Sequence, residues 1–194
     1  MIGLFGRILN HWIICFDMDK SKIATFLTII IGKATNVYPH ERSAYAEILD
    51  DLHKLIRFVN EAQAEEMRTI NNQIKKCESI IVDVQRAERK NFDLDVIISI
   101  TQGELRNFPH VDVALNTYAD VLDYYRKVLQ KLIAMKYECA IFCKTLVEKI
   151  QDLVHWTEKA YQKKMNLQLF CTWMLRDLHH IQKELNFVEV IRDV

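Results

Sequence analysis

The chain has 194 residues, half of them hydrophobic, and contains only 4 glycines and 2 prolines. Turn-forming residues are too scarce for a sheet protein, so the composition predicts an all-α fold. The 26 basic and 26 acidic residues give a formal net charge of zero, which argues against a dedicated nucleic-acid-binding protein.

The first 16 residues are mostly apolar and contain one arginine. They are too short to span a bilayer, which takes about 20 apolar residues. As a helix, this segment would either pack on the rest of the protein or lie in a membrane interface. In the second case the residues expected to contact the membrane are Leu4, Phe5, Leu9, Trp12, Ile13 and Phe16.

A short helix is predicted over residues 22–31, with Asp19 or Ser21 as its N-cap and Gly32 after its end. A long helix is predicted from about Glu41. Its apolar residues recur in steps of three and four, at Tyr45, Ile48, Leu52, Leu55, Val59 and Ala62.

The apolar stripe of this helix then shifts by five residues to Met67. Such a shift predicts a bend or a local change in supercoiling, with Glu66 facing solvent or marking a contact site. Residues 90–93 are expected to end or kink the helix. The apolar residues 94–100 form a further helix, and a turn follows over 103–109.

The longest regular pattern runs over residues 111–146, where every step between apolar positions is three or four. Its members are Val111, Ala114, Tyr118, Val121, Tyr125, Val128, Leu132, Met135, Cys139, Phe142 and Leu146. The chain must later reverse, either at Trp156–Glu158 with Thr157 as a cap or at Gln162–Asn166, which is favoured for its polarity. The last helix then buries either Trp173 or Met174.

These segments predict an elongated antiparallel bundle of three long helices with two short N-terminal helices. The expected division is an N-terminal part, 1–38, and a long-helix bundle, 39–194. The five cysteines are odd in number and lie mostly on apolar stripes, so we expect reduced core thiols in a cytoplasmic protein.

Two carboxylate–imidazole pairs are the one pattern with metal-site spacing. Asp152 and His155 lie three residues apart, as do Asp177 and His180. Di-iron bundles use Glu-x-x-His at this spacing, together with glutamates from two other helices. Here both acids are aspartates near helix ends, and no matching glutamates stand out. The sequence therefore predicts no metal, no cofactor and no enzymatic activity.

The segment Ala114-Leu-Asn-Thr-Tyr-Ala-Asp-Val-Leu-Asp-Tyr-Tyr-Arg-Lys-Val-Leu129 resembles the second helix of BAR-type membrane-curvature domains, including those of sorting nexins. The order of an amphipathic N-terminal helix and three long helices is also similar. This resemblance implies a crescent-shaped homodimer that binds anionic membranes. The segment Cys171-Thr-Trp-Met-Leu-Arg-Asp-Leu-His179 looks like the last helix of four-helix cytokines.

The expected function is that of a non-enzymatic helical interaction scaffold. Its partner would be another protein or a second copy of the chain, since long apolar stripes favour self-association. Peripheral attachment to an anionic membrane through the N-terminal helix belongs to this expectation. The alternatives are a membrane-inserting bundle of the pore-forming or cell-death type, and a helical binding protein similar to cytokines or adaptors.

Overall fold

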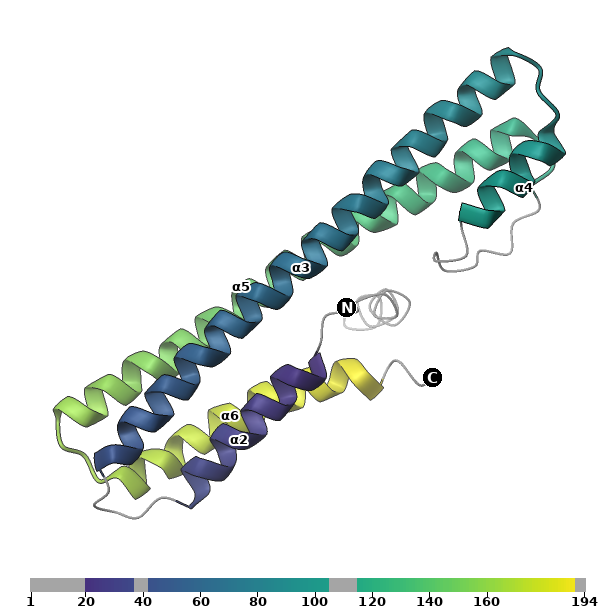
Figure 1. Cartoon of the computed structure of the whole chain (residues 1–194). Coiled ribbons are helices and arrows are strands. Elements are labelled where there is room, and N and C mark those ends of the chain that lie inside the picture. The colour runs from purple at the N-terminus through teal and green to yellow at the C-terminus, as the bar shows by residue number, and fades with distance from the viewer. Residues whose placement is uncertain (1–19, 37–41, 105–114, 191–194) are drawn as a thin grey trace, which may run out of the picture. The chain divides into compact units, whose positions relative to one another are not determined.

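The computed structural model describes residues 20–36, 42–104 and 115–190 (Figure 1). All regular structure in these ranges is helical, which confirms the all-α class. The helices are α2 (Lys20–Thr35), α3 (Arg42–Arg89), α4 (Leu94–Glu104), α5 (Tyr118–Gln162) and α6 (Leu167–Val190).

Several predictions concern residues outside the described ranges. They include all the residues expected to contact a membrane, which are Leu4, Phe5, Leu9, Trp12, Ile13 and Phe16. The same holds for Asp19 as a cap, for Glu41, and for Val111 and Ala114 at the start of the longest stripe.

The contacts divide the chain into two compact units. Unit 1 consists of Met1–Glu66 and Glu138–Val194, and unit 2 consists of Met67–Tyr137. Both α3 and α5 therefore contribute one part of their length to each unit. The division at residue 38 expected from the sequence is a different one, and it stays a prediction.

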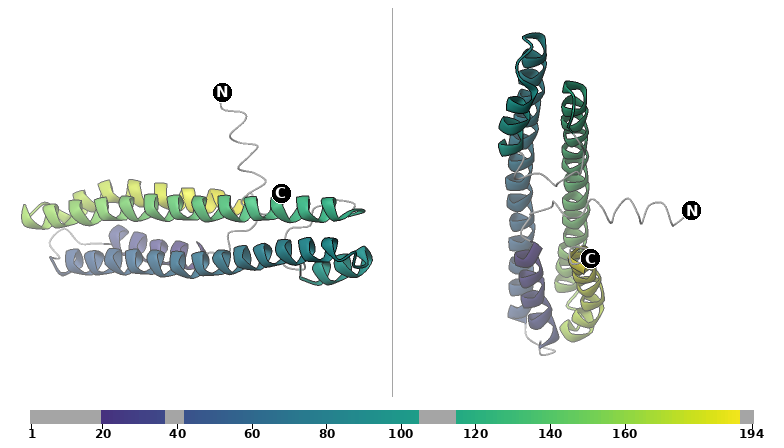
Figure 2. Two further views of the ribbon diagram at one scale, coloured as in Figure 1. Left: turned by 90° about the horizontal axis from the view of Figure 1, so that it is seen from above. Right: turned by 90° about the vertical axis from the view of Figure 1, so that its right-hand side faces the viewer.

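In unit 1, α2 and α6 lie side by side, as both views in Figure 2 show. Phe26 of α2 stacks on Phe58 of α3 with ring centroids 5.9 Å apart. Between α5 and α6, the Thr157 hydroxyl contacts the Met174 sulfur at 3.9 Å. Side chains from all four helices form one core, which includes Ile23, Leu27, Ile30, Ile48, Leu52, Leu55, Ile150, Leu153, Met174, Leu178 and Ile181.

Unit 2 contains the second part of α3, the short helix α4 and the first part of α5. The buried Cys77 thiol donates a hydrogen bond to the carbonyl oxygen of Tyr125 at 3.2 Å, which joins α3 to α5. The Tyr118 hydroxyl donates to the carbonyl oxygen of Phe92 at 2.6 Å. These bonds fix the start of α5 against the chain that leaves α3.

Helix α2 extends further at both ends than the short helix predicted over residues 22–31. It begins at Lys20, so Ser21 lies inside the helix and is not its cap. It continues to Thr35, so Gly32 does not end it. A glycine inside a helix costs about 1 kcal/mol relative to alanine. The core stripe continues to the buried Ala34, and this packing outweighs the cost.

The start of α5 is later than the apolar stripe predicts, because a cap fixes it at Tyr118. The Thr117 hydroxyl oxygen accepts a hydrogen bond from the Asp120 backbone N–H at 3.1 Å. The Asp120 carboxylate accepts one from the Thr117 backbone N–H at 2.9 Å. This reciprocal pair is a capping box, with aspartate in place of the usual glutamate.

Other boundaries follow the predictions more closely. Residues 90–93 end α3, and residues 94–100 are helical as expected, although α4 continues through Gly103 to Glu104. The chain reverses between Gln162 and Leu167, which confirms the second of the two predicted places. Thr157 therefore lies inside α5, where its hydroxyl donates to the carbonyl oxygen of Leu153 at 2.6 Å.

The buried stripe of α3 keeps its phase where a shift was predicted. Glu66 is only 7% exposed and takes the stripe position between Val59 and Ile70. The predicted shift is therefore wrong. It was inferred from the positions of apolar residues alone, and Glu66 is a charged residue at a buried position. In α6, Met174 is fully buried and Trp173 is exposed, which decides between these two alternatives.

Candidate functional site

The turn that joins α5 to α6 is defined by its own backbone hydrogen bonds. The Met165 N–H donates to the carbonyl oxygen of Ala160 at 3.0 Å, and the Lys164 N–H donates to that of Tyr161 at 3.1 Å. Lys164 has a φ of 52°, in the left-handed region. These features make a Schellman motif, in which the residue after Lys164 turns back towards the last helical turn.

The next helix begins immediately after this motif. The Asn166 side-chain oxygen accepts a hydrogen bond from the Leu169 backbone N–H at 3.1 Å. The Asn166 carbonyl oxygen accepts the first helical bond, from Phe170, at 3.0 Å. Asn166 is thus the N-cap of α6, and only the few residues between Gln162 and Leu167 connect the helices.

Tyr45 of α3 holds the turn from inside unit 1. Its hydroxyl donates to the carbonyl oxygen of Met165 at 3.3 Å. Its ring contacts those of Phe170 and Tyr161, with centroids 5.9 and 5.8 Å away. The side chain is 3% exposed, and burial, followed by the nearby Cys171 thiol, raises the pKa of its hydroxyl.

An open groove of about 380 Å³ lies along this turn, between the end of α5 and the start of α6. Buried Ala160 and Phe170 line it together with the more exposed Met165 and Leu169. The whole lining, which we call the aromatic groove, consists of Trp156, Lys159, Ala160, Lys163, Met165, Leu169, Phe170 and Trp173.

The two tryptophans of the aromatic groove remain partly open to solvent. Trp156 is 47% exposed and Trp173 is 42% exposed. Their rings meet edge to face, with centroids 6.0 Å apart. Trp173 also contacts the Phe170 ring at 6.2 Å. Each tryptophan is therefore held in place by neighbouring rings while much of its surface stays free for a ligand.

The charges in the aromatic groove have one sign. Lys159 and Lys163 line it, and no acidic side chain does. The Lys159 ammonium lies 5.0 Å from the centroid of the Trp156 ring, which is a cation–π contact. Both lysines lie near the C-terminal end of α5, where the helix dipole favours positive charge. The groove therefore offers apolar rings beside a positive rim.

A second groove, of about 440 Å³, lies in unit 2 between α3 and α4. It contains both Lys76 and Asp83 and is otherwise lined by aliphatic residues and a serine. No aromatic side chain lines it. Because its charges are mixed and it has no ring to anchor a ligand, the aromatic groove of unit 1 is the better candidate.

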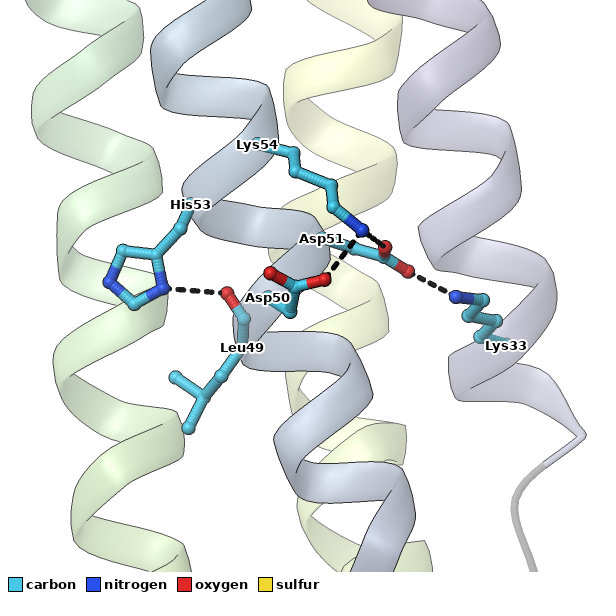
Figure 3. Close-up of polar contacts among 6 residues, drawn as sticks. All are labelled: Lys33, Leu49, Asp50, Asp51, His53 and Lys54. Atoms are coloured by element: carbon cyan, nitrogen blue, oxygen red, sulfur yellow. Dashed lines mark hydrogen bonds and ion pairs between the residues drawn. The ribbon is translucent and has the colours of Figure 1, made fainter.

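A polar cluster between α2 and α3 has a structural role (Figure 3). The Asp51 carboxylate is largely buried and pairs with Lys33 of α2 at 2.5 Å and with Lys54 at 3.7 Å. Lys54 also bonds to the exposed Asp50, and this hydrogen bond lowers the pKa of the Asp50 carboxyl. The buried Asp51 carboxylate thus has an ion-pair partner on each of the two helices, and these pairs stabilise the packing of α2 against α3.

The residues considered for metal binding do not form a site. Asp152 and His155 are exposed on α5. On α6, Asp177 pairs with Arg176 at 3.5 Å, and exposed His180 pairs with Glu184 at 3.2 Å. Over residues 20–36, 42–104 and 115–190, no three histidine, cysteine or acidic residues are grouped so that they could hold a metal ion.

The described cysteines are buried thiols that form no disulfide. They are Cys77, Cys139, Cys143 and Cys171. Burial raises the pKa of both Cys77 and Cys171 to about 11. Because the thiolate is the reactive form, neither of these two side chains is suited to act as a nucleophile near neutral pH.

The aromatic groove was not predicted from the sequence. The signal that could have found it is a set of large apolar residues beside the core stripe, on both sides of the predicted reversal. Trp156, Met165, Leu169 and Trp173 meet this description. Such residues matter only when a tight turn brings them together.

Comparison with known proteins identifies no relative: no protein-family model, curated protein or solved structure matches the chain. Within the described part of the chain, none of the helices has both the length and the apolar character needed to cross a membrane.

Proposed function

We propose that this protein is a non-enzymatic helical binding protein and that the aromatic groove is its recognition surface. The observation that carries the proposal is the pair Trp156 and Trp173, which are partly exposed on a concave surface beside a well-defined turn. Tryptophan is enriched among the residues that contribute most of the energy in protein interfaces.

The magnitude of the exposed surface supports this role. A tryptophan buries up to about 250 Å² when it is fully covered, so a partner could cover about 100 Å² more on each ring. At about 25 cal/mol per Å², covering each ring would stabilise the complex by roughly 2.5 kcal/mol, before the cost of association is subtracted. Micromolar affinity corresponds to a net value of roughly 8 kcal/mol, so the two rings would supply part of it and the surrounding contacts the rest.

The scaffold expected from the sequence belongs to the same proposal. Three long antiparallel helices, with two short ones before them, would carry the groove, and the partner is another protein or a second copy of the chain. Light scattering combined with small-angle X-ray scattering tests this part. An elongated dimer would support it, and a compact monomer would contradict it.

Membrane association is the second candidate. Tryptophan and lysine near the α5–α6 turn have the amphipathic character of residues that lie at lipid headgroups. Co-sedimentation with vesicles of phosphatidylcholine and phosphatidylserine tests this candidate. Binding that is lost when both tryptophans are replaced by alanine would favour it over a protein partner.

The main proposal is tested by selecting displayed random peptides on the full chain. The groove variants are the double substitution W156A/W173A and the single substitution Leu169→Glu, which places a charge at a residue that is 67% exposed. The matched control is I29A/I141A, which truncates two apolar side chains exposed elsewhere in unit 1. Circular dichroism establishes that all variants are folded.

The expected result is that selected peptides bind the wild type and the control equally well. They should lose about tenfold or more in affinity for either groove variant, since tenfold corresponds to only 1.4 kcal/mol. Peptides that bind the groove variants as tightly as the wild type would refute the proposal, because recognition would then use another surface.

A further inference from the structure

We propose that the aromatic groove receives an acidic amphipathic α-helix, with two apolar side chains one turn apart inserted between its walls. This inference rests on the proposed function, since it specifies the partner of the same groove. It follows from three properties of the groove: its length, the hydrogen bonds that its backbone already makes within the protein, and its positive charge.

The length of the groove suits two apolar side chains of the bound helix, which we call the anchors of the ligand. The groove lining covers residues 156–163, at the end of α5 and just after it, and residues 165–173, in the turn and at the start of α6. Each side is about two helical turns long. Two turns extend for about 11 Å, since each turn rises 5.4 Å. Side chains at positions i and i+4 of a helix lie about 6 Å apart, so both fit within this length.

The backbone around the groove favours a helical ligand over an extended one. A bound strand gains affinity mainly by pairing with the open edge of a sheet. The groove is formed by helices, and the turn between them bonds to its own helix ends. A helix satisfies its own backbone and needs only apolar contact, so it is the form that this surface can recognise.

The charge of the groove selects acidic flanks. In the part of the chain that the structure describes, neither Lys159 nor Lys163 pairs with a carboxylate, whereas Lys149 pairs with Glu184. Lys164, in the turn itself, is exposed as well. The charged side chains that line the groove would therefore attract acidic residues beside the two apolar side chains of the ligand. Because these lysines are exposed, the attraction should be modest and should weaken as salt is added.

The experiment uses three labelled peptides of about 16 residues, a length at which a helix forms readily on binding. The acidic peptide carries tryptophan and leucine at i and i+4 with glutamates around them. The basic peptide has lysine in place of each glutamate, and the anchorless peptide has alanine in place of both anchors. Fluorescence anisotropy gives the affinity of each for the full chain at low and at high salt.

The acidic peptide should bind about tenfold more tightly than the basic one at low salt, and this preference should shrink at high salt. The anchorless peptide should bind at least about tenfold more weakly than the acidic one, because it has no large apolar side chains to pack against the two tryptophan rings. In the double variant K159E/K163E the preference should reverse towards the basic peptide. The control variant K144E/K183E, which changes two other lysines exposed in unit 1, should keep the wild-type preference.

The outcomes separate this inference from the proposed function. Groove-dependent binding with equal affinity for the acidic and basic peptides overturns the inference and leaves the proposed function standing. If no peptide, selected or designed, depends on the groove, both fall.

Two other occupants are distinguished by further probes. A synthetic peptide of residues 1–16, which contains Arg7 and no acidic residue, serves as the natural basic comparison. Tighter binding of this peptide than of the acidic one would assign the groove to the chain's own N-terminal segment and overturn the inference. Groove-dependent binding to phosphatidylserine vesicles, with no peptide bound, would also overturn it in favour of a membrane surface.

Discussion

Replacing Tyr45 should test whether the α5–α6 turn is held by the core of unit 1. The Tyr45→Phe substitution removes only the hydroxyl, whose hydrogen bond to the Met165 carbonyl is long at 3.3 Å. A bond of this kind contributes about 0.5–1 kcal/mol. The Tyr45→Ala substitution also removes the ring from its contacts with Phe170 and Tyr161 and leaves a cavity. Truncation of a buried aromatic side chain costs about 3–5 kcal/mol.

Urea unfolding followed by tryptophan fluorescence measures how much each Tyr45 substitution lowers the free energy of unfolding of unit 1. Trp156 and Trp173 both belong to unit 1, so their emission reports on that unit. The matched control is Ile141→Ala, at a side chain of unit 1 that is 52% exposed. This control should change the free energy of unfolding by no more than about 0.5 kcal/mol.

The reasoning would be refuted by either of two results. If Tyr45→Ala cost less than about 1 kcal/mol, the ring would not be packed as the structure shows, because a buried aromatic ring cannot be removed so cheaply. If Tyr45→Phe cost as much as Tyr45→Ala, the hydroxyl and not the ring would hold the turn. The proposed order, a small loss for the hydroxyl and a large loss for the ring, would then be wrong.

Three further predictions concern the turn, the polar cluster and the thiols. Lys164→Gly should raise the free energy of unfolding by about 0.5–1 kcal/mol in the urea assay, because glycine adopts a positive φ without strain. Asp51→Asn and Lys33→Met should each destabilise the chain, and a double-mutant cycle should give a coupling of about 1 kcal/mol; additive losses would contradict their pairing. At pH 8, mass spectrometry should find Cys77 and Cys171 alkylated at least about 100-fold more slowly in the native than in the urea-unfolded chain, since their pKa of about 11 leaves little thiolate. As pH rises from about 9 to 11, the free energy of unfolding should fall, because these thiols ionise first in the unfolded state.

The helices could be predicted from the sequence because their apolar residues keep a helical period over many turns. The burial of Tyr45, Leu52, Val128 and Leu178 agrees with the predicted stripes. A long stripe averages over single deviations, which is why element type is more readily predicted than element ends.

Helix ends were harder to predict because single side chains decide them. The Thr117–Asp120 capping box begins α5 after the apolar stripe has already started. At Gly32, continued burial as far as Ala34 outweighs the tendency of glycine to end a helix. Asn91 and Lys164 both adopt positive φ where helices end, although glycine is the usual residue there. Such outcomes depend on tertiary packing that no local pattern contains.

The groove escaped prediction for a related reason: apart from Ala160 and Phe170, its lining residues are off the core stripe. Exposed apolar side chains are common in such positions and carry little information. What distinguishes Trp156 and Trp173 is that a short turn brings them into edge-to-face contact. The position of that turn was predicted, but its Schellman geometry was not, since lysine occupies the left-handed position.

The same turn explains why the groove is suited to binding. Backbone bonds at Lys164 and Met165, the Asn166 cap and the Tyr45 hydroxyl all restrain this short connection. A binding surface on a flexible loop must be ordered when the partner arrives, which costs free energy for each side chain that is immobilised. Here the fold has already ordered the backbone and both rings, so more of the apolar contact is available for affinity. This argument connects the stability of unit 1 to recognition, because a substitution that loosens Tyr45 should weaken ligand binding even though Tyr45 does not line the groove.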